Sequence, residues 1–300
     1  MKSLYSMTGY AEAAAPVPGA QPALAVRVEL RSVNGRFLDL NWRLPDEARA
    51  AEPQLRALLA GALRRGKVEC RVTIEQPQGA YAQPDAHAVE QLLQAEAALR
   101  QRAPHLRPLS VGDLWRLAST QTGARVDAQQ LGATLQRVAE TALAALQAAR
   151  AAEGQRLGAF LLARCAQLQE WAQQAERLAP QAVARQQERF VARVGEALQA
   201  AGAEGDSEAM RERVLQETAA YAMRIDVAEE ISRLLGHVDA VRTVIGGGGE
   251  VGKRLDFLIQ ELHREANTLG SKSALAELSE RAVDMKVCIE QMREQVQNLE

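Results

Sequence analysis

The chain has 300 residues, of which 25% are charged and 47% apolar, and its formal net charge is -2 at pH 7. This composition is ordinary for a soluble protein of about two domains and excludes a globally basic nucleic-acid coat, so any polyanion must bind to a local patch. Its three cysteines form no Cys-x-x-Cys pair, which excludes a thiolate zinc site and a disulfide framework. No stretch approaches the roughly 20 apolar residues of a membrane span. We therefore expect a cytoplasmic protein without membrane contact.

The first eighty residues have the pattern of an antiparallel sheet with one helix. Apolar and polar residues alternate over 24–30 and again over 38–42, and the sequence Asn34-Gly35 supplies a turn between them. We expect these two strands to form a hairpin. A helix is expected over 53–65, because it begins with a proline, which is favoured in a first turn. Another alternating strand is expected over 68–74.

From about residue 85 the composition changes to Ala, Leu, Gln, Glu and Arg, which are strong helix formers. The sequence therefore predicts an α+β protein. Its N-terminal sheet domain, residues 1–155, is followed by a helical connector, residues 156–206, and an all-α C-terminal domain of long helices, residues 207–300. The expected helices span 86–102, 110–119, 128–178 (with a potential break near Gly154), 181–200, 208–245, 252–268 and 273–299, and 246–249 form a glycine connector.

The last expected helix carries a heptad seam, in which apolar residues alternate at spacings of four and three over about three heptads. The seam consists of Leu278, Ala282, Met285, Ile289, Met292, Val296 and Leu299. Such a seam is filled either by other helices of the same chain or by a second subunit. The pattern favours neither alternative over the other.

The helix expected over 208–245 carries polar residues in one narrow stripe, because residues three or four apart share a helix face. The stripe consists of Asp226, Glu230, Arg233 and His237. It borders apolar residues, so its carboxylates and imidazole would lie next to buried surface. The alternative is an ordinary ladder of intrahelical ion pairs, such as Glu229 with Arg233, and the residues alone give both interpretations about equal weight.

The next helix, expected over 252–268, has polar residues on both sides of its apolar face. Asp256, Gln260, His263 and Asn267 line one edge, while Glu261 and Glu265 project on the other side with Arg264 between them. Carboxylate and amide oxygens favour a hard cation such as Mg²⁺ or Mn²⁺ over zinc. The alternative is a solvated polar face, which is the more common origin of such a pattern.

Two parts of the chain are candidates for phosphate binding. The segment from Gly247 to Lys253 has the spacing of a phosphate-binding loop, but Arg254 replaces the required Ser or Thr and no strand precedes it, which excludes a nucleotide-hydrolysing P-loop. A helix that opens with Lys253 and Arg254 can still meet a phosphate at its N-terminus. The sheet domain also has a group of basic residues that suits phosphate contacts: Arg31, Arg36, Arg43, Arg64, Arg65, Lys67 and Arg71.

Long, ordered motifs in this chain resemble the YicC-like (YicC/YloC) family of bacterial proteins over essentially its full length. The N-terminal motifs are Ser6-Met-Thr-Gly-Tyr10, Arg31-Ser-Val-Asn34, Arg36-Phe-Leu-Asp39 and Arg65-Gly-Lys-Val-Glu-Cys70. The C-terminal motifs are Arg224-Ile-Asp-Val-Ala-Glu-Glu230, His237, Arg254-Leu-Asp-Phe257, Gln260-Glu261, Arg264-Glu-Ala-Asn-Thr268 and Ser271-Lys-Ser273. Residues of about 80–205 match only in helical character, and many relatives have Asn in place of His263.

The resemblance implies a divalent-metal-dependent endoribonuclease that acts on single-stranded or flexible RNA. It further implies a homo-oligomer, expected to be a hexamer, with roles in small-RNA turnover and stress response and with partners in RNA degradation. Mg²⁺ or Mn²⁺ would be held by Glu230, Asp256, Glu261 and Glu265, with His237 as a catalytic residue that orients a ligand or shuttles a proton. RNA and phosphate would be bound by Arg31, Asn34, Arg36, Arg65, Lys67, Arg254, Arg264 and Lys272.

Two other functions are alternatives to a nuclease. The first is a non-catalytic RNA-binding adaptor oligomer that presents RNA to another nuclease, in which case the carboxylates form ion pairs that hold the oligomer together. The second is a structural coiled-coil assembly protein, which predicts no RNA binding that weakens with salt.

Overall fold

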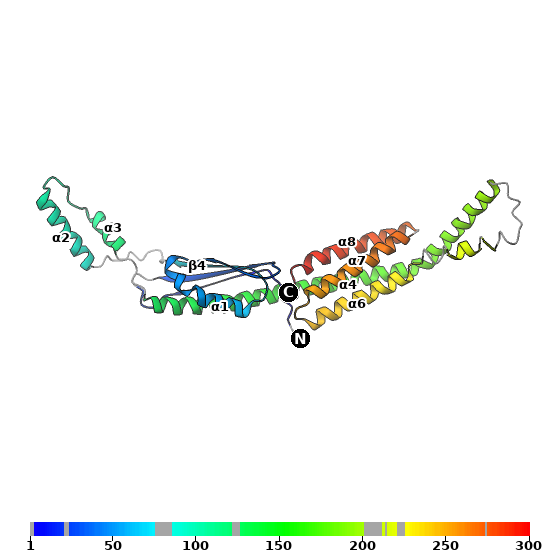
Figure 1. The fold of residues 1–300 in the computed structure, drawn as a ribbon, viewed down its shortest axis with the longest axis horizontal. Coiled ribbons are helices and arrows are strands. Elements are labelled where there is room, and N and C mark those ends of the chain that lie inside the picture. The colour runs from blue at the N-terminus through cyan, green and yellow to red at the C-terminus, as the bar shows by residue number, and fades with distance from the viewer. Residues whose placement is uncertain are drawn as a thin grey trace. The chain divides into compact units, whose positions relative to one another are not determined.

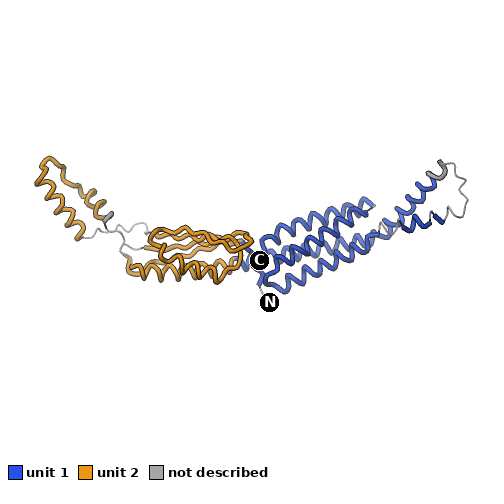
Figure 2. The backbone as a smooth tube through the Cα atoms, in the orientation of Figure 1, with its two compact units in different colours: residues 1–7, 150–300 blue, residues 8–149 orange. Residues whose placement is uncertain are grey.

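The computed structural model describes residues 3–20, 24–75, 86–121, 127–200, 212–213, 215–220, 226–273 and 275–300. The chain divides into two compact units, which are coloured separately in Figure 2. One unit consists of residues 8–149, and the other of residues 1–7 together with 150–300. The fold class is α+β, as expected, with all four described strands in the first unit. None of the described helices is long and apolar enough to span a membrane.

The sheet in residues 8–149 has four strands: β1 (Gly9–Pro16), β2 (Ala25–Val33), β3 (Leu38–Arg43) and β4 (Gly66–Glu75). Their order is β1-β2-β4-β3, and β2 is antiparallel to both of its neighbours. β3 instead pairs in parallel with β4, so the sheet is mixed and the hairpin expected across Asn34-Gly35 is wrong. After β2 the chain crosses to the far edge of β4, where the Gly66 N–H donates to the Phe37 carbonyl at 3.2 Å.

The core of this unit lies on one face of the sheet. Alternate residues of β2 and β4 are buried there, and they pack against α1 (Glu52–Ala62) and the first part of α4 (Ala128–Ala200), which lie along the sheet in Figure 1. The buried residues include Val26, Val28, Leu30, Val68, Val72, Leu55, Leu59, Leu135 and Leu146. A short 3₁₀ helix (Asp46–Ala51) precedes α1, and α2 (Ala86–Arg102) packs against α3 (Val111–Gln121). The helices expected over 86–102 and 110–119 are therefore confirmed.

α4 is one helix of 73 residues that includes Pro180, so the breaks expected near Gly154 and between residues 178 and 181 are wrong. Gly154 has a different role in the helix. A Cβ at this position would collide with the backbone carbonyl of Leu4, so the glycine lets the N-terminal segment lie directly on α4. The residue is thus explained by tertiary packing and not by a helix end.

The unit of residues 150–300 is a helical bundle. The second part of α4 packs with α6 (Ala228–Gly247), α7 (Gly252–Lys272) and α8 (Ala276–Val296), as Figure 1 shows. The helix expected over 208–245 is interrupted. Residues 212–213 and 215–220 are helical as predicted, whereas Asp226 and Val227 are not, and α6 begins at Ala228. Residues 208–211, 214 and 221–225 of that prediction lie outside the described residues. Gly248 and Gly249 have positive φ angles and end α6 before the short connection to α7.

The heptad seam of α8 is filled within the chain. All seven of its residues are buried in the core that α8 shares with α4, α6 and α7. Leu255, Ile259 and Leu262 of α7 belong to the same core. The structure therefore decides between the two alternatives in favour of intrachain packing, which also removes the support for a structural coiled-coil protein.

The two chain ends meet in the same unit and form what we call the terminal cluster, which consists of Ser6, Arg150 and Glu300. Ser6 forms an isolated antiparallel bridge with Leu299. The Arg150 guanidinium donates from Nε to the Ser6 carbonyl at 2.6 Å and from Nη2 to the Glu300 carboxylate, also at 2.6 Å. In return, the Ser6 N–H donates to the Arg150 carbonyl at 2.9 Å. These bonds attach both chain ends to α4.

Candidate metal-binding site

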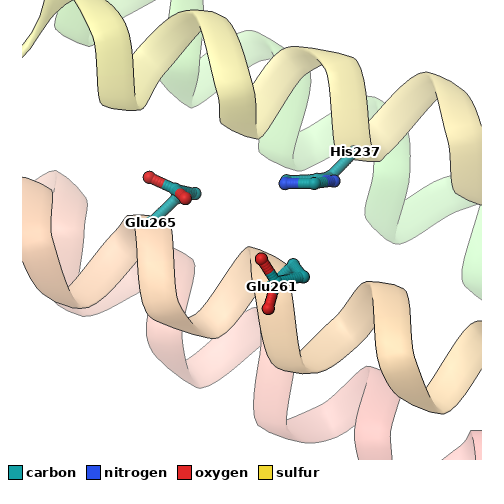
Figure 3. A group of neighbouring side chains, drawn as sticks. All are labelled: His237, Glu261 and Glu265. Atoms are coloured by element: carbon teal, nitrogen blue, oxygen red, sulfur yellow. The ribbon is translucent and has the colours of Figure 1, made fainter.

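α6 and α7 are antiparallel neighbours joined by residues 248–251, and they bring three chemically active side chains together. A ring nitrogen of His237 and one carboxylate oxygen each of Glu261 and Glu265 all lie within 4.8 Å of one another. Figure 3 shows His237 on α6 facing the two carboxylates on α7. We call these three residues the His237 group.

Local sequence explains how α7 presents both carboxylates. Glu261 and Glu265 are one helical turn apart, so they share a face. They flank the apolar stripe of Leu255, Leu258, Leu262, Ala266 and Leu269, which is buried in the bundle core. Burial of this stripe fixes the rotation of α7 and thereby directs the two carboxylates toward α6.

The negative charge of the His237 group is poorly compensated. Glu265 is only 2% exposed, and its one described ion pair is a long contact of 3.9 Å to Nε of Arg264. The same guanidinium lies 3.3 Å from Glu261, but the Arg264 side chain is 63% exposed and therefore screened by solvent. A buried carboxylate is unfavourable unless a nearby cation and hydrogen bonds balance it. Two carboxylates and an imidazole that converge around so little positive charge fit a bound divalent cation.

Glu230 and Lys272 form a separate pair between the same two helices. The Lys272 Nζ atom lies 2.8 Å from Oε1 of Glu230 and 3.1 Å from the Asp226 carbonyl oxygen. Glu230 was expected to be a metal ligand and Lys272 a phosphate ligand. The structure brings these two residues to each other, and Glu230 does not join the His237 group.

The polar edge of α7 expected around Asp256 does not converge on His237. Asp256 accepts a hydrogen bond from Gln260 at 2.9 Å, and Asn267 contacts His263 at 3.0 Å, so both pairs run along α7. The His263 ring also lies 3.7 Å from Glu290 of α8, on another side of the helix. Arg254 is exposed in the first turn of α7.

The expected RNA-binding residues of the sheet belong to the other unit. Arg31 and Lys67 are exposed on β2 and β4, and Asn34 and Arg36 are exposed between β2 and β3. Arg65 donates to the Arg36 carbonyl at 3.3 Å, which attaches the end of the α1–β4 connection to this loop. Arg31 also lines a surface hollow of about 520 Å³ together with Tyr10, Glu29, Arg43, Glu69 and Arg71. Three arginines and two glutamates line it, so the hollow has no strong charge of one sign.

The cysteines offer no competing nucleophile. Burial raises the pKa of Cys70 to about 12 and the pKa values of Cys165 and Cys288 to about 11. These thiols therefore stay protonated near neutral pH, where a nucleophilic cysteine must be a thiolate. Cys288 lies in the bundle core, where it contributes to packing.

Sequence reasoning placed His237 near the carboxylates but did not name it as a ligand. A usable signal was the short connection at residues 248–251. In an antiparallel helix pair, residues at similar distances before and after the connection lie opposite each other. His237 precedes this connection by about as many residues as Glu261 follows it, and the same comparison pairs Glu230 with the end of α7.

Comparison with known proteins identifies the family over nearly the whole chain. Residues 4–159 match the model described as "Endoribonuclease YicC-like, N-terminal region", and residues 175–300 match "Endoribonuclease YicC-like, C-terminal". The "Probable endoribonuclease YicC" of Haemophilus influenzae is 35% identical over 274 residues, which cover 91% of this chain and 92% of the relative. A protein of the same name from Clostridioides difficile is 27% identical over 277 residues, with coverage of 91% and 93%. The chain therefore belongs to the YicC-like endoribonuclease family.

Proposed function

We propose that this protein is an endoribonuclease that hydrolyses phosphodiester bonds in single-stranded or flexible RNA and requires a divalent cation. The observation that carries the proposal is the His237 group, in which an imidazole and two carboxylates converge with little compensating positive charge. The names of the two relatives and of both family models support the reaction class.

His237, Glu261 and Glu265 would hold the cation. Carboxylate ligands suit Mg²⁺ and Mn²⁺, and the imidazole makes Mn²⁺ the better match of the two. A divalent cation supplies Lewis-acid activation of water and offsets charge on the scissile phosphate. Burial of Glu265 lowers the local dielectric and so strengthens its attraction for a cation.

Arg264 is the residue of α7 best placed to receive the scissile phosphate. Its guanidinium lies within 4 Å of both carboxylates of the His237 group, yet the side chain remains largely exposed. A guanidinium has five N–H donors, so donors remain for phosphate oxygens. Arg254, two turns before Glu261 in the direction of the α7 N-terminus, would bind a neighbouring phosphate with help from the helix dipole.

The remaining expectations are proposals about the assembled enzyme. Arg31, Asn34, Arg36, Arg65 and Lys67 would hold flanking RNA in the sheet unit through phosphate contacts. The protein would act as a homo-oligomer, expected to be a hexamer, in the cytoplasm. Its physiological role would be small-RNA turnover and stress response with partners in RNA degradation. Asp256 would act near the site as an additional carboxylate and not as a member of the His237 group.

The decisive experiment measures cleavage of a labelled single-stranded RNA by purified protein in Mn²⁺, in Mg²⁺ and in EDTA. We expect cleavage with either cation and none in EDTA. A Glu261→Gln/Glu265→Gln variant should lose at least the roughly 10–100-fold that substitutions beside a metal site cost. The matched control is Glu294→Gln on α8, where the glutamate is exposed.

Two outcomes would contradict the proposal in different ways. Full cleavage in EDTA would exclude the metal mechanism. Full activity of the double variant, with an unchanged oligomeric state, would exclude the His237 group as the active site. Salt-sensitive RNA binding without any cleavage would instead identify the adaptor function.

A further inference from the structure

The pair of Glu230 and Lys272 forms a second polar contact between α6 and α7, beyond the His237 group. Glu230 precedes His237 by two turns of α6, which corresponds to about 10 Å along the helix axis. Metal ions that share one reacting phosphate lie about 3.5–4 Å apart. Glu230 is therefore two turns away from the place where His237 would hold a cation, and its carboxylate does not join the His237 group.

Lys272 already occupies the position that a cation would take at Glu230. Its Nζ atom lies 2.8 Å from Oε1 of Glu230 and 3.1 Å from the Asp226 carbonyl oxygen. Glu230 is 6% exposed, and its second oxygen, Oε2, has no hydrogen-bond partner among the described residues. The ammonium is the counter-charge that permits this carboxylate to be buried.

The pair presents its positive end to solvent. The Lys272 side chain is 29% exposed, whereas that of Glu230 is 7% exposed. An ammonium has three donors, and the two described hydrogen bonds use two of them. One donor therefore remains for an anion that approaches from the accessible side, and the carboxylate behind it keeps the ammonium in place.

We infer that Lys272 binds a second phosphate of the same RNA strand, and that Glu230 is the residue that positions Lys272 and is not a metal ligand. This inference rests on the proposed function, because the first phosphate is the one held at the His237 group. A single phosphate group cannot contact both places across two helical turns. An RNA strand that runs parallel to α6 and α7 offers successive phosphates and can contact both places.

The inference predicts different effects on RNA binding for substitutions of Glu230 and of Lys272. If the pair only ties α6 to α7, then Glu230→Gln and Lys272→Met break the same tie and change RNA binding equally. If Lys272 contacts a phosphate, removing the lysine weakens RNA binding and lowers its salt dependence. Glu230→Gln keeps the positive charge and only loosens its position, so the affinity falls less and the salt dependence stays unchanged.

The experiment measures the affinity of each variant for a labelled single-stranded RNA in EDTA, at several salt concentrations. We expect Lys272→Met to bind roughly tenfold more weakly, as for loss of one charge-assisted contact. Its slope of log affinity against log salt should be smaller by about 0.7, the value for one phosphate contact on a single strand. Glu230→Gln and the matched control Lys286→Met on α8 should keep the wild-type slope.

Folding is controlled with a second variant, since Lys272→Met leaves Glu230 buried without its counter-charge. The double variant Glu230→Gln/Lys272→Met has no buried charge at this place and should show the same loss of slope as Lys272→Met. An unchanged slope in both lysine variants, or equal losses in Lys272→Met and Glu230→Gln, would overturn the inference.

Metal binding separates this inference from the proposed function. Titration of the protein with Mn²⁺ should give the same affinity for wild type, Lys272→Met and Glu230→Gln. Weaker Mn²⁺ binding by Glu230→Gln would overturn the assignment of Glu230 as a positioning residue. Metal-independent cleavage by the wild type would instead contradict the proposed metal site, and it would leave the salt slopes as the measure of the second phosphate contact.

Discussion

Arg150 and Glu265 are almost completely buried charges in the same unit, yet their surroundings differ. Arg150 is 3% exposed and donates to both a carboxylate and a backbone carbonyl at 2.6 Å. Glu265 is buried to a similar degree, but its one described ion pair is 3.9 Å long and involves a largely exposed arginine. The first charge is fully compensated by the chain, and the second is not.

The difference separates a structural cluster from a candidate active site. Removing a charge from water is costly, and a chain recovers the cost only through close opposite charges and hydrogen bonds. The terminal cluster meets this condition with its own residues, so it needs no ligand. The His237 group does not, so a bound cation would supply the missing charge. Three predictions test this contrast, beginning with the largest expected effect.

Arg150→Met should strongly destabilise the protein. The substitution leaves the partly buried Glu300 carboxylate without its partner and removes the donor to the Ser6 carbonyl. Breaking a buried ion pair costs about 3–5 kcal/mol. Urea denaturation at fixed protein concentration measures the loss. The control is Arg156→Met on the same helix, where the arginine side chain is 77% exposed and should contribute less than about 1 kcal/mol. Equal losses in the two variants would contradict the contrast.

Glu265→Gln should have the opposite signature. In EDTA its stability should equal or exceed that of the wild type, because the variant removes a poorly compensated buried charge. Mn²⁺ at 100 times its dissociation constant should stabilise the wild type by about 2.7 kcal/mol, and the variant should lose most of this gain. Thermal or urea unfolding with and without Mn²⁺ measures both effects. The control variant Glu294→Gln should gain as much stability from Mn²⁺ as the wild type. If Glu265→Gln gains the same amount, Glu265 binds no metal.

Gly154→Ala should give a smaller loss that reports on packing at the terminal cluster. The added Cβ would collide with the Leu4 carbonyl, and overpacking of this kind costs about 1–3 kcal/mol. Gly132→Ala is the matched control on the same helix. Nothing lies within 4 Å of a Cβ at that position, so alanine should be neutral or stabilise by up to about 1 kcal/mol. If both substitutions stabilise the protein, the N-terminal segment does not lie on α4 in solution.

Alternation in the sequence identified three strands of the sheet, β2, β3 and β4, but not their neighbours. A period of two specifies which residues of β2 and β4 are buried, and Val28 and Val72 are buried as predicted. It carries no information on pairing, so the expected hairpin was wrong. β1 escaped prediction because it is rich in alanine, which is depleted in strands. It is held in the sheet by pairing along β2.

Helix breaks were predicted from single residues, and tertiary contacts overrode them. Gly154 and Pro180 are unfavourable within a helix by themselves. α4 nevertheless continues through both. Before Gly154 its buried residues, such as Leu146, pack in the core of the sheet unit, and after Gly154 and on both sides of Pro180 they pack in the bundle core. The same core fills the heptad seam of α8, which the pattern assigned equally to intrachain and intersubunit packing.

For the candidate site, helical spacing named the right kinds of residue but not their partners. Periodicity placed Glu230 and His237 in one stripe of α6, and Glu261 and Glu265 on one side of α7. Only the antiparallel packing of the two helices brings His237 to the two carboxylates and Glu230 to Lys272. Family resemblance identified the reaction class, which no helix face could supply.

The sequence by itself determined the α+β class, the family, and which residues share a strand or helix face. The class and the shared faces follow from local periodicity, because the backbone geometry of a helix or strand fixes the direction of each side chain. The family follows from long, ordered motifs. The tertiary structure decided which faces meet, which seam is filled within the chain, and which buried charges are compensated. Those properties depend on contacts between segments far apart in the sequence and on the cost of removing charge from water, and neither is present in the local pattern.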